Sequence, residues 1–372
     1  MSRWSVAKAR EWYRARPWIV GCNFILGTAI NQLEMWQAET YDPATIEREL
    51  GWAESLGFNA LRVYLHDLVW SADAGGFAAR IDDFLRIAQR HGMKVLLVLF
   101  DDCHRPAPRL GVQPLPVPGV HNSGWQQSPG QNLVLQFHDG TVPDKERTRL
   151  AEYVQGVLNR FADDERILMW DVYNEPGNSG NHDKTLDLLK LTWGWARAVN
   201  PSQPLTACLD GSSGERNIAL NAEQSDVITF HRYSGHGLEK TILHHAASHS
   251  GRPVICTEYM AREFGTTFQY SLPIFKRHGV GCFNWGLVAG KSQTHFNWET
   301  VNAMEELKAQ GAVLKPGDPI PEPALWFHDI FRMDGTPFDR EEVAFIRKIT
   351  QAPGGNKAEW MPGHSARKLE TE

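Results

Sequence analysis

The chain has 372 residues, 42% hydrophobic and 22% charged, so it can bury a large core and is too apolar for general disorder. Its 44 Asp and Glu residues outnumber its 38 Lys and Arg residues. The formal net charge of −6 argues against a protein that binds nucleic acid by electrostatic attraction. The five cysteines form no CxxC pair, which indicates neither a zinc finger nor a disulfide framework. Unpaired cysteines fit a reducing compartment, and we expect a cytoplasmic protein.

The N-terminal segment contains an apolar stretch over residues 18–30 that follows several arginines. Glu11 and Asn23 are unusual in a signal peptide, and this stretch also supplies the first expected strand. We therefore expect the stretch to be retained, with secretion by an atypical signal as the alternative. No apolar run reaches the ~18 residues of a membrane-spanning helix, so we expect no membrane partner.

Short apolar runs alternate along the chain with amphipathic helical patterns. Asp42 and Pro43 begin the clearest helical pattern and Gly57 ends it, as expected for an N-cap, a first-turn proline and a C-terminal glycine. The apolar runs are continuous and rich in β-branched and aromatic residues, which is typical of parallel strands buried on both faces. Eight strands are expected, over residues 18–24, 60–65, 94–100, 167–173, 205–209, 227–230, 254–256 and 281–285.

Eight strand–helix units in a chain of this size predict an α/β fold, a (β/α)₈ TIM barrel, as a single domain over residues 1–351. A doubly wound open sheet is the main alternative, but the chain lacks the glycine-rich phosphate turn of that fold. A long loop rich in proline and glycine, about residues 101–143, follows the third strand, and such loops often build the site of a barrel enzyme. Residues 352–372 are polar and are expected to form a flexible tail.

Two carboxylates follow strands that lie across the expected barrel from each other. The motif Asn174-Glu175-Pro176 ends the fourth strand, and Glu258 ends the seventh. The C-terminal ends of barrel strands face the place where such enzymes bind their substrates, so both carboxylates can approach one ligand. Two carboxylates that flank a bond are what glycosidic cleavage requires.

With these motifs the sequence resembles a clan A glycoside hydrolase, closest in pattern to family 5, the cellulase family, over about residues 18–330. Four further positions match in order: Arg62 on the second strand, His231 and Tyr233 after the sixth, and Trp285 at the end of the eighth. The resemblance implies a retaining β-glycosidase that binds carbohydrate and requires no cofactor or metal. The expected substrates are β-linked oligosaccharides or polysaccharide fragments of the glucan, xylan or mannan type.

The resemblance also implies a role for each matching residue. Glu175 would be the acid/base and Glu258 the nucleophile, so Glu175 must be protonated near neutral pH while Glu258 stays charged. Arg62 and Tyr233 would hydrogen-bond Glu258 and keep it ionised. The other implied binding residues are Asn174 at the sugar 2-hydroxyl, His231 beside the acid/base and Trp285 against the sugar ring. For Arg62, His231 and Trp285, a purely structural role in the core is the alternative.

Two segments depart from the family pattern. The third strand of family 5 usually ends in a sugar-binding histidine, and here either His104 or one of the aspartates Asp101 and Asp102 could take that role. The first loop, residues 31–36, differs from that of ordinary cellulases, which leaves a sister family of the clan open. Further candidates for substrate contacts, with ordinary loop surface as the alternative, are Glu34, Trp36, Trp125 and Lys291.

Two other classes of function stay open. One is a metal-dependent sugar-processing barrel enzyme, in which His66, Asp67, His104 and His231 would converge. The other is a noncatalytic carbohydrate-binding barrel, which the two intact carboxylates disfavour. His245 and His249 have ligand spacing on an expected helix, but we interpret them as solvated surface. The sequence leaves open the sugar beside the cleaved bond, exo or endo action, and the oligomeric state.

Overall fold

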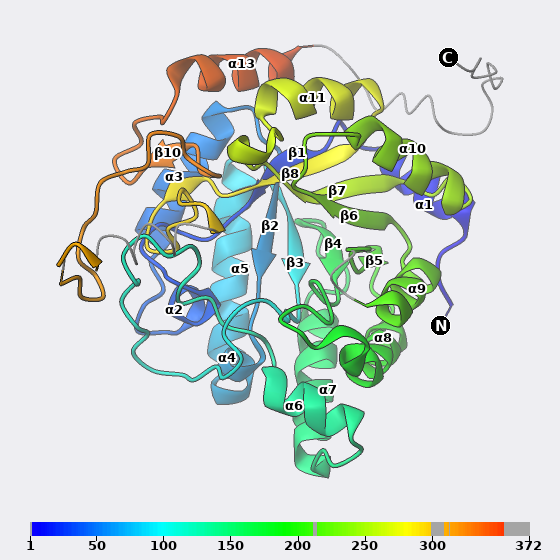
Figure 1. Ribbon diagram of the computed structural model, residues 1–372. Helices are drawn as coiled ribbons and strands as arrows, with labels where there is room; N and C mark the ends of the chain where they lie inside the picture. Colours follow the sequence, from blue (N-terminus) through cyan, green and yellow to red (C-terminus); the bar gives the residue numbers. More distant parts are fainter. Residues whose placement is uncertain (1, 211–213, 299–308, 312, 353–372) are drawn as a thin grey trace.

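The computed structural model describes residues 2–210, 214–298, 309–311 and 313–352, and its centre is a sheet of eight parallel strands (Figure 1). The strands are hydrogen-bonded in the order β5-β4-β3-β2-β1-β8-β7-β6. A parallel bridge between Cys208 and Thr229 joins the two ends of this order, so the barrel is nearly closed. The predicted (β/α)₈ barrel is confirmed. Its strands are β1 (Val20–Asn23), β2 (Ala60–Tyr64), β3 (Lys94–Val98), β4 (Ile167–Asp171), β5 (Leu205–Thr206), β6 (Ile228–Arg232), β7 (Val254–Tyr259) and β8 (Gly281–Trp285).

Two strands extend further than the sequence interpretation placed them. β6 includes His231, and β7 continues through Glu258 to Tyr259. The register between these strands shifts after Phe230, so that His231 is paired with Glu258. Because paired residues of neighbouring parallel strands lie side by side, this shift brings two ionisable side chains together at the C-terminal end of the barrel.

Helices surround the barrel, and the clearest ones begin and end where the sequence predicts. Asp42 accepts a hydrogen bond from the Thr45 backbone N–H at 3.0 Å and so caps the helix that begins at Pro43. The α-helices are α1 (Val6–Arg14), α2 (Gln32–Trp36), α3 (Pro43–Ser55), α4 (Asp67–Ala72), α5 (Ala74–Arg90), α6 (Gln131–His138), α7 (Asp144–Arg160), α8 (Leu186–Val199), α9 (Glu215–Gln224), α10 (Leu238–Ser248), α11 (Phe268–Arg277) and α13 (Arg340–Gln351). Two 3₁₀ helices are η1 (His182–Thr185) and η3 (Arg262–Phe264).

The first and last helices complete the barrel. α13 packs beside α11, in the place of the helix expected after β8 (Figure 1), and its Thr350 hydroxyl donates to the Leu56 carbonyl at 2.7 Å. The sequence interpretation did not include α1. This helix places Tyr13 in the inner core, where the Tyr13 hydroxyl donates to the Gly279 carbonyl at 2.7 Å. Since Gly279 precedes β8, α1 closes the N-terminal end of the barrel.

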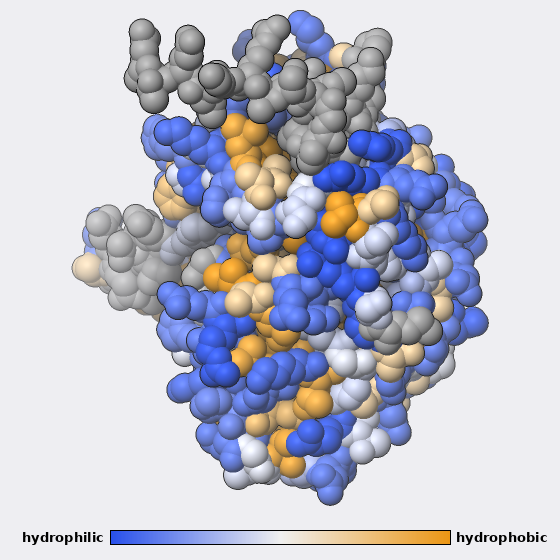
Figure 2. Space-filling model, turned by 90° about the vertical axis from the view of Figure 1, so that its right-hand side faces the viewer, coloured by the Kyte–Doolittle hydropathy of each residue, from blue (hydrophilic) through white to orange (hydrophobic). Residues whose placement is uncertain are grey.

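The long loop expected over residues 101–143 contains one helix, α6, and is otherwise irregular. A two-stranded sheet of β9 (Val288–Ala289) and β10 (Phe331–Arg332) follows the barrel strands. Of the expected tail, residues 353–372 lie outside the described residues. No helix within the described ranges is long and apolar enough to cross a membrane. Figure 2 shows the side that carries α9 and α10, where hydrophilic residues cover most of the surface.

Candidate active site

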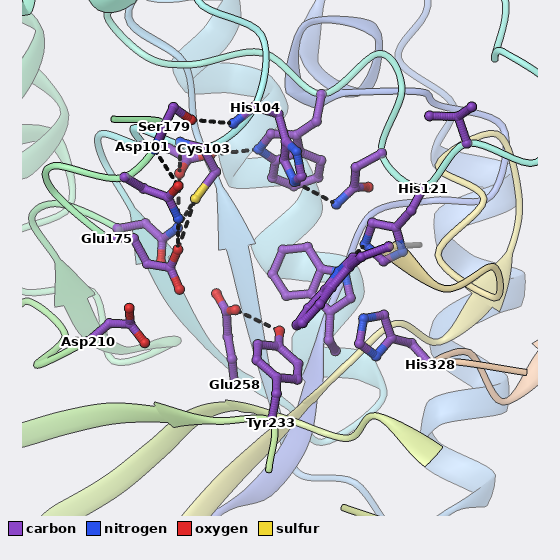
Figure 3. A pocket seen from close by; sticks show the side chains of 17 residues that line it. Asp101, Cys103, His104, His121, Glu175, Ser179, Asp210, Tyr233, Glu258 and His328 are labelled. Carbon is purple, nitrogen blue, oxygen red and sulfur yellow. Dashed lines mark hydrogen bonds between the residues drawn. The ribbon is translucent and has the colours of Figure 1, made fainter. Parts of the chain in front are cut away.

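A cavity of about 490 Å³ lies at the C-terminal ends of the barrel strands (Figure 3). Arg62 and His231 do not line this cavity, but both are bonded to carboxylates that do. The sequence-predicted residues that line it are His104, Trp125, Asn174, Glu175, Tyr233, Glu258 and Trp285. The structure therefore brings together the residues of the predicted site that follow β3, β4, β6, β7 and β8.

Glu175 lies in the turn that leaves β4, with a backbone φ of +40°. This left-handed conformation is rare for a residue that precedes proline, so the surrounding contacts must hold it. The backbone N–H of Glu175 contacts the sulfur of Cys208 at 3.3 Å. One carboxyl oxygen, Oε1, lies 2.7 Å from Nδ1 of His231, and the other, Oε2, accepts from the Cys103 thiol at 3.2 Å. These contacts fix both the backbone and the carboxyl group.

Glu258 accepts hydrogen bonds at both of its carboxyl oxygens. Oε1 accepts from Nη1 of Arg62 and from the hydroxyl of Tyr64, each at 2.7 Å. Oε2 accepts from the hydroxyl of Tyr233 at 2.8 Å, and Nδ1 of His231 lies 3.5 Å from it. This buried carboxylate is therefore surrounded by hydrogen-bond donors from β2, from β6 and from the segment after β6.

The two carboxyl groups differ in their acidity. Burial raises the pKa of Glu175, and the nearby carboxylate of Asp210 raises it further. Burial alone would also raise the pKa of Glu258, but the charges of His231 and Arg62 and the hydrogen bonds from tyrosine hydroxyls lower it below its ordinary value. The site can thus hold one carboxylic acid and one carboxylate at the same pH.

Arg62 connects β2 to the residues around the carboxylates. Its guanidinium is fully buried, and Nη2 donates to Asp171 at 2.8 Å and to Oδ1 of Asn174 at 2.6 Å. Nδ2 of Asn174 donates to Asp101 at 2.9 Å. The amide of Asn174 is therefore oriented, with its oxygen toward Arg62 and its nitrogen toward Asp101. A fixed amide beside two carboxyl groups can bind a polar ligand at a defined position.

Comparison with known families agrees with this geometry. The model of the family described as Cellulase (glycosyl hydrolase family 5) matches residues 27–291. This chain belongs to glycosyl hydrolase family 5. It is accordingly an O-glycosyl hydrolase, and the choice between family 5 and a sister family is settled. No curated protein sequence matches the chain.

Solved structures of family 5 enzymes share the fold of this enzyme at low sequence identity. The exo-β-1,4-mannosidase Op5Man5 from Opitutaceae bacterium strain TAV5 has a TM-score of 0.58 at 15% identity, over 89% of this chain and 59% of that one. A GH5_18 variant from Streptomyces cattleya, in complex with Manβ1-4GlcNAc, has a TM-score of 0.57 at 13% identity, over 91% and 83%. The endo-1,4-β-D-mannanase of Thermotoga petrophila RKU-1 has a TM-score of 0.53 at 14% identity, over 89% and 99%.

The segment after β3 places Asp101, and not His104, in contact with Asn174. Asp101 contacts Asn174 and also accepts from Nε1 of Trp125 at 2.6 Å, and its burial raises its pKa to about 7. His104 lies further along the loop, where its ring contacts the amide of Asn122 at 3.3 Å. In this family 5 enzyme an aspartate therefore makes the contact beside Asn174, while His104 lines the cavity at another point.

Three candidate substrate contacts do not line the cavity. Trp36 is fully buried, stacks against Tyr41 and donates through Nε1 to the Tyr64 carbonyl at 2.7 Å, so it belongs to the core. Glu34 and Lys291 form an ion pair at 2.6 Å and do not line the cavity. This pair connects the segments that follow β1 and β8 in the family 5 enzyme.

The metal group of the alternative interpretation does not form. His66 lies 3.1 Å from Asp67, whose other oxygen accepts from Arg149 at 2.6 Å, and neither residue lines the cavity. Among the described residues, one other group has the spacing of metal ligands: Glu175, Asp210 and His231. Nδ1 of that histidine already bonds the Glu175 carboxyl group, and a cation there would compete with this hydrogen bond.

Several residues of the site were not found from the sequence. Tyr64 lies two positions after Arg62 on β2, and alternation along a strand places both on the same face, so this signal was available. Trp298 and His328 come from the segments after β8, where no periodic pattern pointed to the barrel mouth. Cys103 and Asp210 are single residues in irregular segments and carry no sequence signal of their own.

Proposed function

We propose that this family 5 enzyme is a retaining β-glycosidase in which Glu175 is the acid/base and Glu258 is the nucleophile. One observation carries the proposal: both carboxyl groups contact Nδ1 of His231, yet their pKa values shift in opposite directions. A retaining glycosidase needs one protonated and one ionised carboxyl group on the two sides of the scissile bond.

The spacing of the carboxyl groups supports retention over inversion. Nδ1 of His231 lies 2.7 Å from Oε1 of Glu175 and 3.5 Å from Oε2 of Glu258. These two oxygens are therefore no further apart than the two distances combined. Such a spacing fits the ~5–5.5 Å of retaining enzymes and leaves little room for the ~6.5–9.5 Å of inverting ones.

The reaction proceeds in two displacements. The carboxylate of Glu258 attacks the anomeric carbon while Glu175 gives its proton to the glycosidic oxygen, so the bond to the leaving group breaks and a glycosyl ester forms. Glu175, now ionised, then takes a proton from water, and the water oxygen displaces Glu258 from the anomeric carbon. One water molecule is consumed, both carboxyl groups return to their starting states, and the anomeric configuration is retained.

Two further side chains have positions that suit binding of the reacting sugar, and a third holds the nucleophile. Asn174 is oriented beside both carboxyl groups, where it can bond the 2-hydroxyl. Trp285 lines the cavity at the end of β8 and offers an apolar face to the pyranose ring. The hydroxyl of Tyr233 bonds the nucleophile. We propose soluble β-linked oligosaccharides as substrates, and mannosides first, because the names of the structural neighbours refer to β-mannosides.

The test is a panel of aryl β-glycosides of mannose, glucose, xylose, galactose and cellobiose, with and without chelator. Chelator-insensitive release of the aryl group, with the β-anomer as first product by NMR, is the expected result. Release that requires a metal ion would favour the metal-dependent alternative instead. Binding of sugars without turnover of any glycoside would favour a noncatalytic barrel.

Two variants separate the proposed roles. Glu258→Ala should lose turnover, and azide, as a small external nucleophile, should restore it with an α-glycosyl azide as product. Glu175→Ala should keep turnover of glycosides with good leaving groups, and azide should give the β-glycosyl azide. Full activity of Glu258→Ala without azide would overturn the assignment.

A further inference from the structure

We propose that the cavity accepts one sugar residue from the non-reducing end of a β-1,4-linked chain, so that the enzyme acts as an exo-glycosidase. This inference rests on the proposed function, because the roles of Glu175 and Glu258 define which way the chain lies.

The positions of the carboxyl groups set the direction of the substrate. The acid/base must touch the glycosidic oxygen, so the leaving group lies against Glu175 and the reacting sugar lies over Glu258. In a β-1,4-linked chain the next sugar toward the non-reducing end is attached across the ring, on the side away from the leaving group. Figure 3 shows Glu175 and Asp210 at one end of the cavity and His121 and His328 at the other. Further non-reducing sugars would have to pass the end with His121 and His328.

Aromatic side chains also line the cavity. Trp125 packs against Trp285 and Tyr64, with ring centroids 5.6 and 5.0 Å apart. Trp125 is only 2% exposed, and its indole N–H is bonded to Asp101. A separate space that these rings also line measures about 10 Å³, which is about the volume that one water molecule needs.

Hydrogen bonds between loops hold this end closed. The tip of the loop after β3 is joined to the loop after β8: the Asn122 N–H donates to the Ser292 carbonyl at 2.9 Å, and the Gly119 N–H donates to Gln293 at 2.8 Å. Asn31 of the loop after β1 donates to the Gly124 carbonyl at 2.8 Å. The loops after β1, β3 and β8 are therefore connected through buried polar contacts. Together they form a wall of the cavity, and this wall is part of the fold.

The wall presents hydrogen-bond acceptors to the cavity. Oδ1 of Asn122 and Nε2 of His328 are buried and have no hydrogen-bond partner among the described residues, and both side chains line the cavity. Nδ1 of His328 faces the Met260 carbonyl and so carries the ring proton, which leaves Nε2 as an acceptor. Acceptors at this position suit the free hydroxyl of a terminal sugar, because that hydroxyl can donate a hydrogen bond. A sugar inside the chain lacks this free hydroxyl.

Exposed side chains also line the opposite end of the cavity. Near Glu175 the lining residues are Asn178, which is half-buried, and Ser179, which is exposed. The cavity volume of about 490 Å³ also falls in the lower part of the ~300–1,000 Å³ typical of small-molecule pockets. The leaving group has a path past Glu175, whereas the reacting sugar meets the side chains of Asn122 and His328.

The experiment compares two β-1,4-linked hexasaccharides labelled at the reducing end, one free and one 4-O-methylated at its non-reducing end, in the manno, gluco and xylo series. We expect monosaccharide as the only unlabelled product at early times, and cleavage of the methylated chain slower by at least about tenfold, because a closed pocket must exclude the added methyl group. Mid-length labelled fragments, or equal rates for both chains, would overturn the inference while leaving the glycosidase proposal intact. If neither chain and no aryl glycoside is cleaved, the proposed function itself fails.

A pair of variants tests the wall. Asn122→Ala should raise KM for the aryl monosaccharide glycoside and narrow the difference between free and methylated chains, with kcat less affected. Val112→Ser is the matched control, because Val112 lies on the same loop and is fully exposed. The contrary result is an Asn122→Ala variant with the melting temperature of the control, an unchanged KM and an unchanged rate difference between free and methylated chains. It would show that Asn122 does not bind the terminal hydroxyl.

Discussion

The hydroxyl of Tyr64 donates to Oε1 of Glu258 at 2.7 Å, and it approaches from β2, on the opposite side of the carboxylate from Tyr233. Nη1 of Arg62 also donates to the Tyr64 oxygen, at 2.6 Å, so the hydroxyl proton is directed at the carboxylate. Tyr64 therefore stabilises the ionised form of Glu258 together with Arg62, although it does not line the main cavity.

We predict that Tyr64→Phe raises the pKa of Glu258, because the variant loses a donor to the charged form. Glu258 must be ionised to attack, so the acidic limb of the kcat/KM profile should move to higher pH. A hydrogen bond to a charged group contributes about 1.5–3 kcal/mol, so kcat/KM at the optimum should fall roughly 10- to 100-fold. Tyr41→Phe, which removes a hydroxyl bonded to Asp83 in the outer helices, is the control and should leave the acidic limb in place.

Asp210 gives a prediction for the alkaline limb of the kcat/KM profile. Its charge raises the pKa of Glu175 and, after burial, makes the largest contribution to this shift. Asp210→Asn should therefore lower the pKa of Glu175, and the alkaline limb of kcat/KM should move to lower pH because Glu175 must be protonated in the first step. Asp187→Asn, at an exposed position on α8, should leave this limb unchanged. An unmoved alkaline limb in Asp210→Asn would show that Asp210 does not act on Glu175.

Arg62 is expected to affect both stability and turnover. Arg62→Met leaves Asp171 and Glu258 buried without their cation, and loss of one partner of a buried pair costs about 3–5 kcal/mol of unfolding free energy. Denaturant unfolding should show this loss, and turnover should fall with it. Arg90→Met removes an exposed pair with Glu47 and should cost no more than about 1 kcal/mol. Equal losses for the two variants would contradict the buried network.

The sequence predicted the barrel because its strands are continuous apolar runs and its helices carry readable ends, such as Asp42 and Pro43 of α3. It did not predict α1, whose short, mostly polar sequence contributes Tyr13 to the inner core only through tertiary packing. It ended the apolar run of β7 at Cys256, whereas the strand continues through Glu258. The register shift after Phe230, which pairs His231 with Glu258, has no local signal in the sequence.

For the site, sequence reasoning located the residues that belong to motifs at strand ends and was weaker in loops. Asn174 and Glu175 were found because a proline follows them at the end of a buried strand. Trp36 was expected at the substrate, but an aromatic side chain in a loop can turn either way, and here it packs against Phe77. His328 reaches the cavity from a segment that follows the barrel, and only the assembled structure shows this.

Glu49 on α3 is a buried carboxyl group outside the site. Its side chain is inaccessible to solvent, both of its oxygens accept from the single N–H of Gly27, at 3.1 and 3.0 Å, and the nearest cation, on Arg48, is 3.9 Å away. Burial raises the pKa of Glu49 to about 8, from an ordinary value of 4.5. Between these two pH values the folded state binds a proton that the unfolded state has released, so the free energy of unfolding must fall as pH rises.

We therefore predict that Glu49→Gln is as stable as the parent near pH 4 and more stable at pH 8, by up to about 4 kcal/mol. Glutamine keeps an oxygen for the Gly27 N–H and has no proton to lose, so the fall in stability between pH 4.5 and 8 should be absent or smaller in the variant. Denaturant unfolding at four or five pH values measures this difference directly. Glu54→Gln, at an exposed position of the same helix, is the control. A stability difference that stays constant with pH would show that Glu49 does not titrate as a buried acid.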